Sequence, residues 1–204
     1  MKAQVSVKQI IIDFIYLKNQ LKTLFKENQK YKPIIDFLLE KDYLDEELNL
    51  PYPKLKEVEE ATGLKSHRLR KVLLKMHSEI FTYERKLNLN FNKVLYHFHI
   101  SYFDYRCQFT VDYLHHLPKI GEEISLPFVS ALIPLNHFYV ENIRHEFENE
   151  NQIVIVSLKV GSYNEYYRFM KDKAIELNVI RSWDIYSKSE HEIKEIIYSK
   201  NEYR

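Results

Sequence analysis

One short segment of the chain concentrates positive charge. Between Lys65 and His77 there is no acidic residue, and the five basic residues are Lys65, Arg68, Arg70, Lys71 and Lys75. Arg68, Lys71 and Lys75 are spaced by three and four residues, so a helix places them on one side. Cationic side chains on one helix face can neutralise phosphate groups. The spacing therefore predicts a surface for a polyanion.

Apolar residues in the same segment predict the helix that holds these charges. They recur at steps of three and four residues: Leu69, Val72, Leu73, Met76 and Ile80. Ser66 is a residue type that caps a helix start. Before it, Leu55 and Val58 give a shorter helix one apolar face, and Gly63 accepts the left-handed backbone that a tight turn requires. The pattern predicts a short helix, a glycine turn and a capped second helix.

This order of elements resembles the helix-turn-helix of small bacterial DNA-binding domains, over about residues 53–80. The residues that carry the resemblance are Val58, Gly63, Leu64, Leu69 and Val72, with Ser66 opening the second helix. One position departs from the family pattern, because Glu59 stands where a small residue is usual.

The resemblance implies double-stranded DNA as partner, with helix 66–80 in the major groove. The expected DNA-binding residues are Lys65, Ser66, His67, Arg68, Arg70, Lys71 and Lys75. His67 and Arg68 are the candidates for base contact, and Lys65, Lys71 and Lys75 for phosphate contact. The expected role is that of a transcriptional regulator or a mobile-element accessory protein.

The amino-acid composition excludes several classes of protein. The 204 residues include 30 basic and 29 acidic side chains, yet residues 1–86 hold 17 basic against 13 acidic and the remainder 13 against 16. Three glycines leave no glycine-rich phosphate loop, and the single Cys107 has no partner for a disulfide within the chain. No apolar run is long enough to span a bilayer. We expect a cytoplasmic, non-enzymatic protein with no catalytic residues, no cofactor, no metal and no membrane partner.

The predicted fold class is α+β, with a helical domain over residues 1–86 and a β-rich domain over 87–204. An apolar seam from Ala3 to Phe25 predicts one long first helix, and Pro33 begins a second helix that reaches about Leu44. The seam is broad, which favours packing inside the domain over a dimerising coiled coil. The sequence leaves open whether the chain also forms a homodimer.

Alternation of aromatic and polar residues predicts strands from about Val94 onward. The phase changes at Phe103 and Asp104, which fits two strands or one bent strand. A further strand is expected to run to Val129, and residues 138–147 and 152–160 predict a hairpin. A small barrel, somewhat similar to SH3-like barrels, or a curled antiparallel sheet is expected. Helices over 163–177 and 189–200 follow, the second capped by Ser189.

Three other interpretations compete with DNA binding. In the first, the helical unit is purely structural and belongs to a protein-interaction module, which binds a protein partner through its β-rich domain. In that case, acids of Asp42–Glu47 or Glu57–Glu60 should neutralise the basic face. His97 and His99 share one strand face, as two ligands of a metal ion would. Tyr163, Tyr166 and Tyr167, beside Arg168 and Lys171, have the residue types that stack on single-stranded bases.

Overall fold

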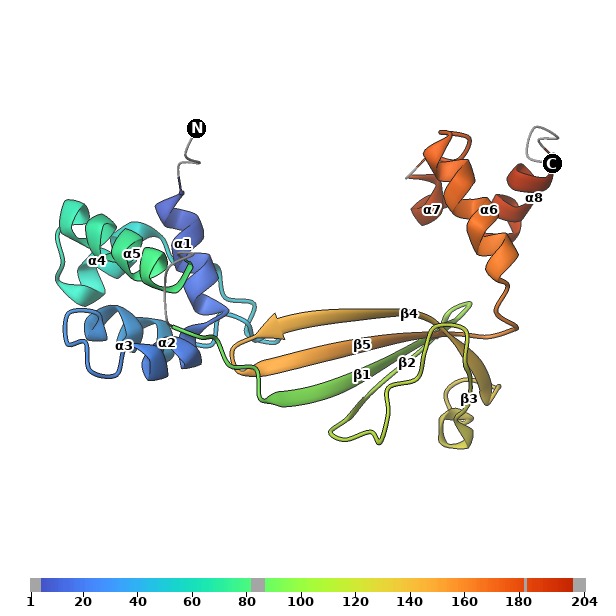
Figure 1. The fold of residues 1–204 in the computed structure, drawn as a ribbon, viewed down its shortest axis with the longest axis horizontal. Helices are drawn as coiled ribbons and strands as arrows, with labels where there is room; N and C mark the ends of the chain where they lie inside the picture. Colours follow the sequence, from blue (N-terminus) through green and yellow to red (C-terminus); the bar gives the residue numbers. More distant parts are fainter. Residues whose placement is uncertain (1–4, 82–86, 182, 200–204) are drawn as a thin grey trace. The chain divides into compact units, whose positions relative to one another are not determined.

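The computed structural model describes residues 5–81, 87–181 and 183–199. Helices come first along the chain, then a five-stranded sheet, then further helices, which is an α+β fold (Figure 1). The predicted domain boundary at residue 86 lies outside the described residues. Contacts divide the chain into two compact units. The first comprises Met1–Tyr96, Val111–Tyr113 and His145–Val154, and the second comprises His97–Thr110, Leu114–Arg144 and Ile155–Arg204.

The helices of the first unit are α1 (Val7–Ile15), α2 (Lys18–Leu24), α3 (Lys32–Glu40), α4 (Leu55–Thr62) and α5 (Ser66–Phe81). The single long first helix predicted from the apolar seam is wrong. Leu17 leaves the helical conformation (φ −120°, ψ 9°), and the Tyr16 carbonyl accepts a hydrogen bond from the Asn149 N–H at 2.6 Å. Apolar spacing continues across the break, so periodicity alone does not reveal it.

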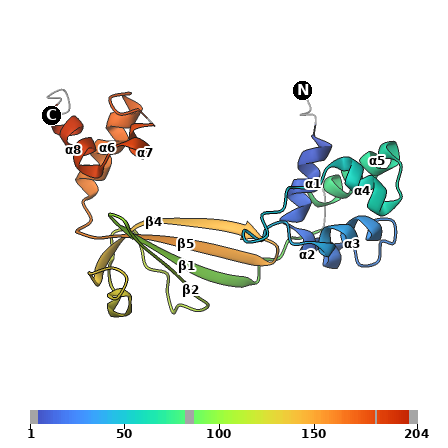
Figure 2. The ribbon, with the colours of Figure 1, turned by 180° about the vertical axis from the view of Figure 1, so that it is seen from behind.

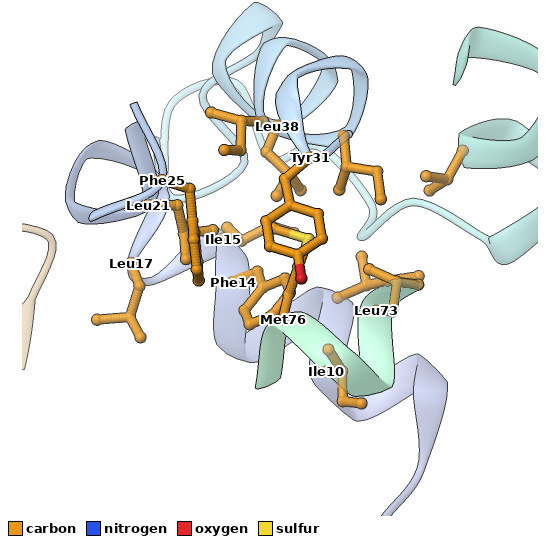
Figure 3. Close-up of a cluster of buried hydrophobic side chains, with 14 of the residues drawn as sticks. Ile10, Phe14, Ile15, Leu17, Leu21, Phe25, Tyr31, Leu38, Leu73 and Met76 are labelled. Atoms are coloured by element: carbon orange, nitrogen blue, oxygen red, sulfur yellow. The ribbon is translucent and has the colours of Figure 1, made fainter. Parts of the chain in front are cut away.

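The core of the first unit lies between α1 and α5. Ile10 and Phe14 of α1 and Leu73 and Met76 of α5 are completely buried, and Figure 3 shows these side chains side by side. The apolar face of the first helix is therefore covered within its own unit, as predicted. Each such side chain contributes roughly 1.5–3 kcal/mol through burial.

A buried glutamine joins α2 to two loops of the same unit. Gln20 is 4% exposed. Its Nε2 donates to the carbonyl of Asn149, and its Oε1 accepts the N–H of Asn90 at 2.7 Å. Because both ends of the amide are used, this polar side chain is buried without loss of hydrogen bonding.

A half-buried ion pair links α2 to the segment that follows α3. Lys18 Nζ is 2.9 Å from Asp42 Oδ1. The hydrogen bond from Lys18 lowers the pKa of the Asp42 carboxyl below its usual value. A carboxyl whose pKa is lowered by folding stabilises the folded state above the unfolded pKa, and that contribution disappears as the pH falls through the folded pKa.

We expect this ion pair to contribute to acid sensitivity. Unfolding free energy measured by urea titration should fall below about pH 4, where an unfolded aspartate begins to take up a proton. Asp42→Asn should lower the stability at pH 7 and make the curve flatter below pH 4. Equal slopes for the two proteins in this range would contradict the assignment.

The sheet consists of β1 (Lys93–Tyr102), β2 (Tyr105–Val111), β3 (Glu123–Ser125), β4 (His137–Glu148) and β5 (Asn151–Lys159), in the order β2-β1-β5-β4-β3. The phase change at Phe103 marks a turn between two strands, with Phe103 at φ +49°. The predicted hairpin corresponds to β4 and β5. The strand expected to reach Val129 ends at Ser125, and a 3-10 turn covers Pro127–Val129.

The predicted α+β class is confirmed, and of the two sheet forms left open by the sequence, a small barrel or a curled antiparallel sheet, the barrel is not formed by the described residues. In the part of the chain that the structure describes, the strands form one mixed sheet that is not closed into a barrel. The edge strand β3 has three residues and pairs with β4, which leaves too little backbone for a ladder to β2. Phe109 of β2 instead meets Phe128, which follows β3, in an edge-to-face contact with ring centroids 5.4 Å apart.

The C-terminal helices are α6 (Glu165–Glu176), α7 (Asp184–Ser187) and α8 (Glu190–Ser199). They share a small core that includes Met170, Ala174, Ile193 and Ile197. The predicted cap at Ser189 is confirmed, because its Oγ accepts the Glu192 N–H at 3.3 Å while the Glu192 carboxylate accepts the Ser189 N–H at 2.7 Å. This reciprocal arrangement is a capping box.

Candidate nucleic-acid interface

The basic segment lies on α5, directly after a glycine turn. α4 ends at Thr62, Gly63 adopts a left-handed conformation (φ +66°), and α5 begins at Ser66. Figures 1 and 2 both show α4 and α5 next to each other. The predicted order of short helix, glycine turn and second helix is present, and its role as a DNA-binding motif stays a prediction.

Gly63 allows a direct test of this turn. A Cβ atom at this position would meet no atom within 4 Å, so alanine costs backbone strain without a clash. We expect Gly63→Ala to lower the unfolding free energy by about 1 kcal/mol, and Gly63→Asn to lower it less, because asparagine tolerates a positive φ better. Urea denaturation of the three proteins measures this difference, and equal stabilities would show that the turn does not depend on glycine.

The apolar side of α5 fixes its orientation in the unit. Leu69, Leu73, Met76 and Ile80 are buried there, together with Val58 of α4. His77 belongs to this packed side as well. Its ring lies 4.7 Å from that of Phe81 and its Nε2 lies 3.9 Å from Asp13. His77 is therefore part of the helix packing rather than of the basic face.

The opposite side of α5 carries the predicted contact residues. Six of the seven are exposed: Lys65, His67, Arg68, Arg70, Lys71 and Lys75. Ser66 is half-buried and is the first helical residue, so it does not cap the helix as predicted. The N–H groups of Arg68 and Leu69 instead bond to the Lys65 carbonyl at 2.9 Å. The structure thus brings the predicted basic residues together on one exposed helix.

Most of the positive charge on this face is not compensated by acidic side chains of the described residues. Within residues 5–81, 87–181 and 183–199, no ion pair involves Lys65, Arg68, Arg70 or Lys71. Lys75 lies 3.9 Å from Glu79, four residues further along the helix. Because the lysine is exposed and the separation is long, this pair contributes little.

Acids that the competing interpretation invokes are engaged elsewhere. Glu60 of α4 lies 3.8 Å from Lys56 of its own helix, and Asp42 pairs with Lys18. Asp45 accepts the N–H groups of Glu47 and Leu48 through its carboxylate. In the described part of the chain, these acids therefore do not neutralise the basic face by direct pairing.

Sequence reasoning missed one residue of this face. Leu74 is 42% exposed and follows Lys71 by three residues, so it lies among the basic side chains. An exposed leucine there can meet apolar groups such as the methyl of thymine. The signal was present in the sequence, because Leu74 does not fit the three-and-four spacing of the buried residues.

The weaker candidate sites do not assemble. Among the described residues, no group of three or more histidine, cysteine, aspartate or glutamate side chains is placed to hold a metal ion, so His97 and His99 gain no further ligand. Three of the five residues considered for stacking on single-stranded bases are engaged in the fold, because Tyr167 is buried, Arg168 bonds to the Glu141 carbonyl and Lys171 pairs with Glu190.

The fold and the site together define an α+β chain with an exposed basic helix on its N-terminal helical unit. No known protein family matches this chain, and neither a curated protein nor a solved structure is significantly similar to it. In the described ranges, no helix combines the length and apolar character needed to cross a bilayer.

Proposed function

We propose that the chain binds double-stranded DNA and that α5 enters the major groove. The observation that carries this proposal is the exposed basic face at the start of α5, where Lys65, Arg68, Arg70 and Lys71 have no ion-pair partner among the described residues. Phosphates of a duplex supply the missing anions.

The position of these charges supports the proposal further. The first turn of α5 contains no acid and two cationic side chains are near its start, Lys65 and Arg68. The helix dipole makes positive charge unfavourable at this end. Retaining cations there costs a few tenths of a kcal/mol, and an anionic partner compensates for that cost.

The roles of individual residues follow from their place on α5. His67 and Arg68 are near the helix start and reach base edges, while Lys65, Lys71 and Lys75 contact phosphates. We propose that this binding serves transcription regulation or an accessory role in a mobile element.

Fluorescence anisotropy with a labelled mixed-sequence duplex of about 20 base pairs tests the proposal, since non-specific affinity at low salt lies in a measurable range. We expect saturable binding at low ionic strength, and competition by unlabelled duplex. Absence of binding at low salt would overturn the proposal.

A protein-interaction module is the second candidate. Exposed aromatic side chains in the C-terminal helices favour it, because Trp183 is 75% exposed and Tyr186 is 84% exposed. Large aromatic residues are enriched in protein interfaces. This candidate predicts that the duplex does not bind, even at low salt.

A further inference from the structure

A cavity of about 400 Å³ lies on the polar side of the sheet in the second unit. Its polar lining residues are His99, Ser101, Arg106, Gln108, Glu141 and Ser157. They come from β1, β2, β4 and β5, which are neighbours in the order β2-β1-β5-β4. The DNA-binding proposal uses none of these residues.

Strand alternation explains why polar groups gather there. Phe98 and Ile100 of β1, Val156 and Leu158 of β5 and Val140 of β4 are buried. Successive side chains of a strand point to opposite faces, so His99, Ser157 and Glu141 occupy the other face. They form one polar row across three adjacent strands. Gln108 of the neighbouring strand β2 extends this row to the edge of the sheet.

Charges around the cavity favour an anion. Glu141 forms an ion pair with Lys159, which neutralises its carboxylate. Arg106 donates from Nη1 to the carbonyls of Phe103 and Tyr105, at 2.8 and 3.3 Å, and has no acidic partner among the described residues. These bonds hold the guanidinium near the cavity while its other N–H groups stay available.

One polar atom in the wall of this cavity also lacks a hydrogen-bond partner among the residues that the structure describes. His99 Nε2 is buried and has no hydrogen-bond partner in the described part of the chain. Buried polar atoms without a partner are uncommon in folded proteins. His99 also lines the cavity, so a ligand oxygen there can accept a hydrogen bond from an imidazole N–H.

We propose that this cavity binds a small molecule through one anionic group, a phosphate or a carboxylate. Arg106 supplies the compensating charge. Ser101, Ser157 and Gln108 supply neutral donors, and His99 supplies a ring N–H. The site lies in a different unit from α5, so this inference does not rest on DNA binding.

Amide NMR spectra recorded during titration test the proposal. Inorganic phosphate, acetate and chloride are the three probes, each at the same total ionic strength. We expect phosphate or acetate to cause saturable shifts of the Ser101, Gln108 and Ser157 signals, and chloride to cause none. The anion that saturates distinguishes a phosphate site from a carboxylate site. Shifts that grow linearly for every anion would overturn the proposal.

Two variants with the same change in charge separate the site from a general surface effect. Arg106→Gln should raise the dissociation constant at least about tenfold, because it removes the only unpaired cation among the lining residues. Lys119→Gln removes an exposed cation of the same unit that does not line the cavity, and should change the constant less than about twofold. Ser157→Ala should weaken binding while leaving the fold intact. Equal affinities for wild type and Arg106→Gln would contradict the inference.

Discussion

Simultaneous replacement of Arg68, Lys71 and Lys75 by alanine is expected to weaken binding to duplex DNA by roughly 100-fold at about 100 mM salt. The three side chains are exposed and lie on one side of α5. Alanine is the best helix former, so the helix itself should be retained. Lys75 should contribute least of the three, because Glu79 already lies 3.9 Å from its ammonium group.

A matched control separates a specific face from overall charge. Lys22, Lys26 and Lys30 are also exposed lysines of the first unit, and their replacement by alanine removes the same three charges. We expect this control to bind duplex DNA within about threefold of the parent, because long-range charge effects are screened at this salt concentration. Equal losses in both triple variants would show that net charge, and not α5, determines the affinity.

Gln20→Leu is expected to lower the unfolding free energy by about 2–4 kcal/mol. The substitution keeps the volume of the side chain similar but leaves the Asn90 N–H and the Asn149 carbonyl without their buried partner. Each buried group that loses its hydrogen bond costs about 1–3 kcal/mol. Urea denaturation followed by circular dichroism measures the loss.

Asn19→Leu provides the control for this experiment. Asn19 precedes Gln20 in α2 and is exposed, so the same type of change there should alter stability by less than about 0.5 kcal/mol. A Gln20→Leu protein as stable as the Asn19→Leu protein would mean that the amide does not join α2 to the two loops.

Much of the local structure could be predicted because it depends on short-range rules. The spacing of Leu69, Leu73 and Met76 requires a helix with one buried side, and a glycine at position 63 marks the turn before it. Alternation likewise identifies the β4–β5 hairpin. The exposed basic face of α5 follows from the same periodicity, since residues that do not face the core face solvent.

Features that depend on distant contacts could not be predicted. The break after Ile15 is accompanied by a hydrogen bond to Asn149, which is more than a hundred residues away. The burial of Gln20 depends on loops that no local pattern connects to α2. The open edge of the sheet depends on the short length of β3, which the apolar pattern up to Val129 overestimates. The cavity beside Arg106 arises from the order of four strands, and strand order leaves no mark on local spacing.

The salt dependence of duplex binding tests the central claim most directly. For three to five phosphate contacts, the logarithm of the binding constant should fall with the logarithm of salt concentration with a slope of about −3 to −5. The variant lacking Arg68, Lys71 and Lys75 should show a slope about 1.8 units shallower, because Lys71 and Lys75 supply two phosphate contacts at about 0.9 each. Identical slopes for the parent and this variant, or no duplex binding at low salt, would contradict a DNA-binding role for α5.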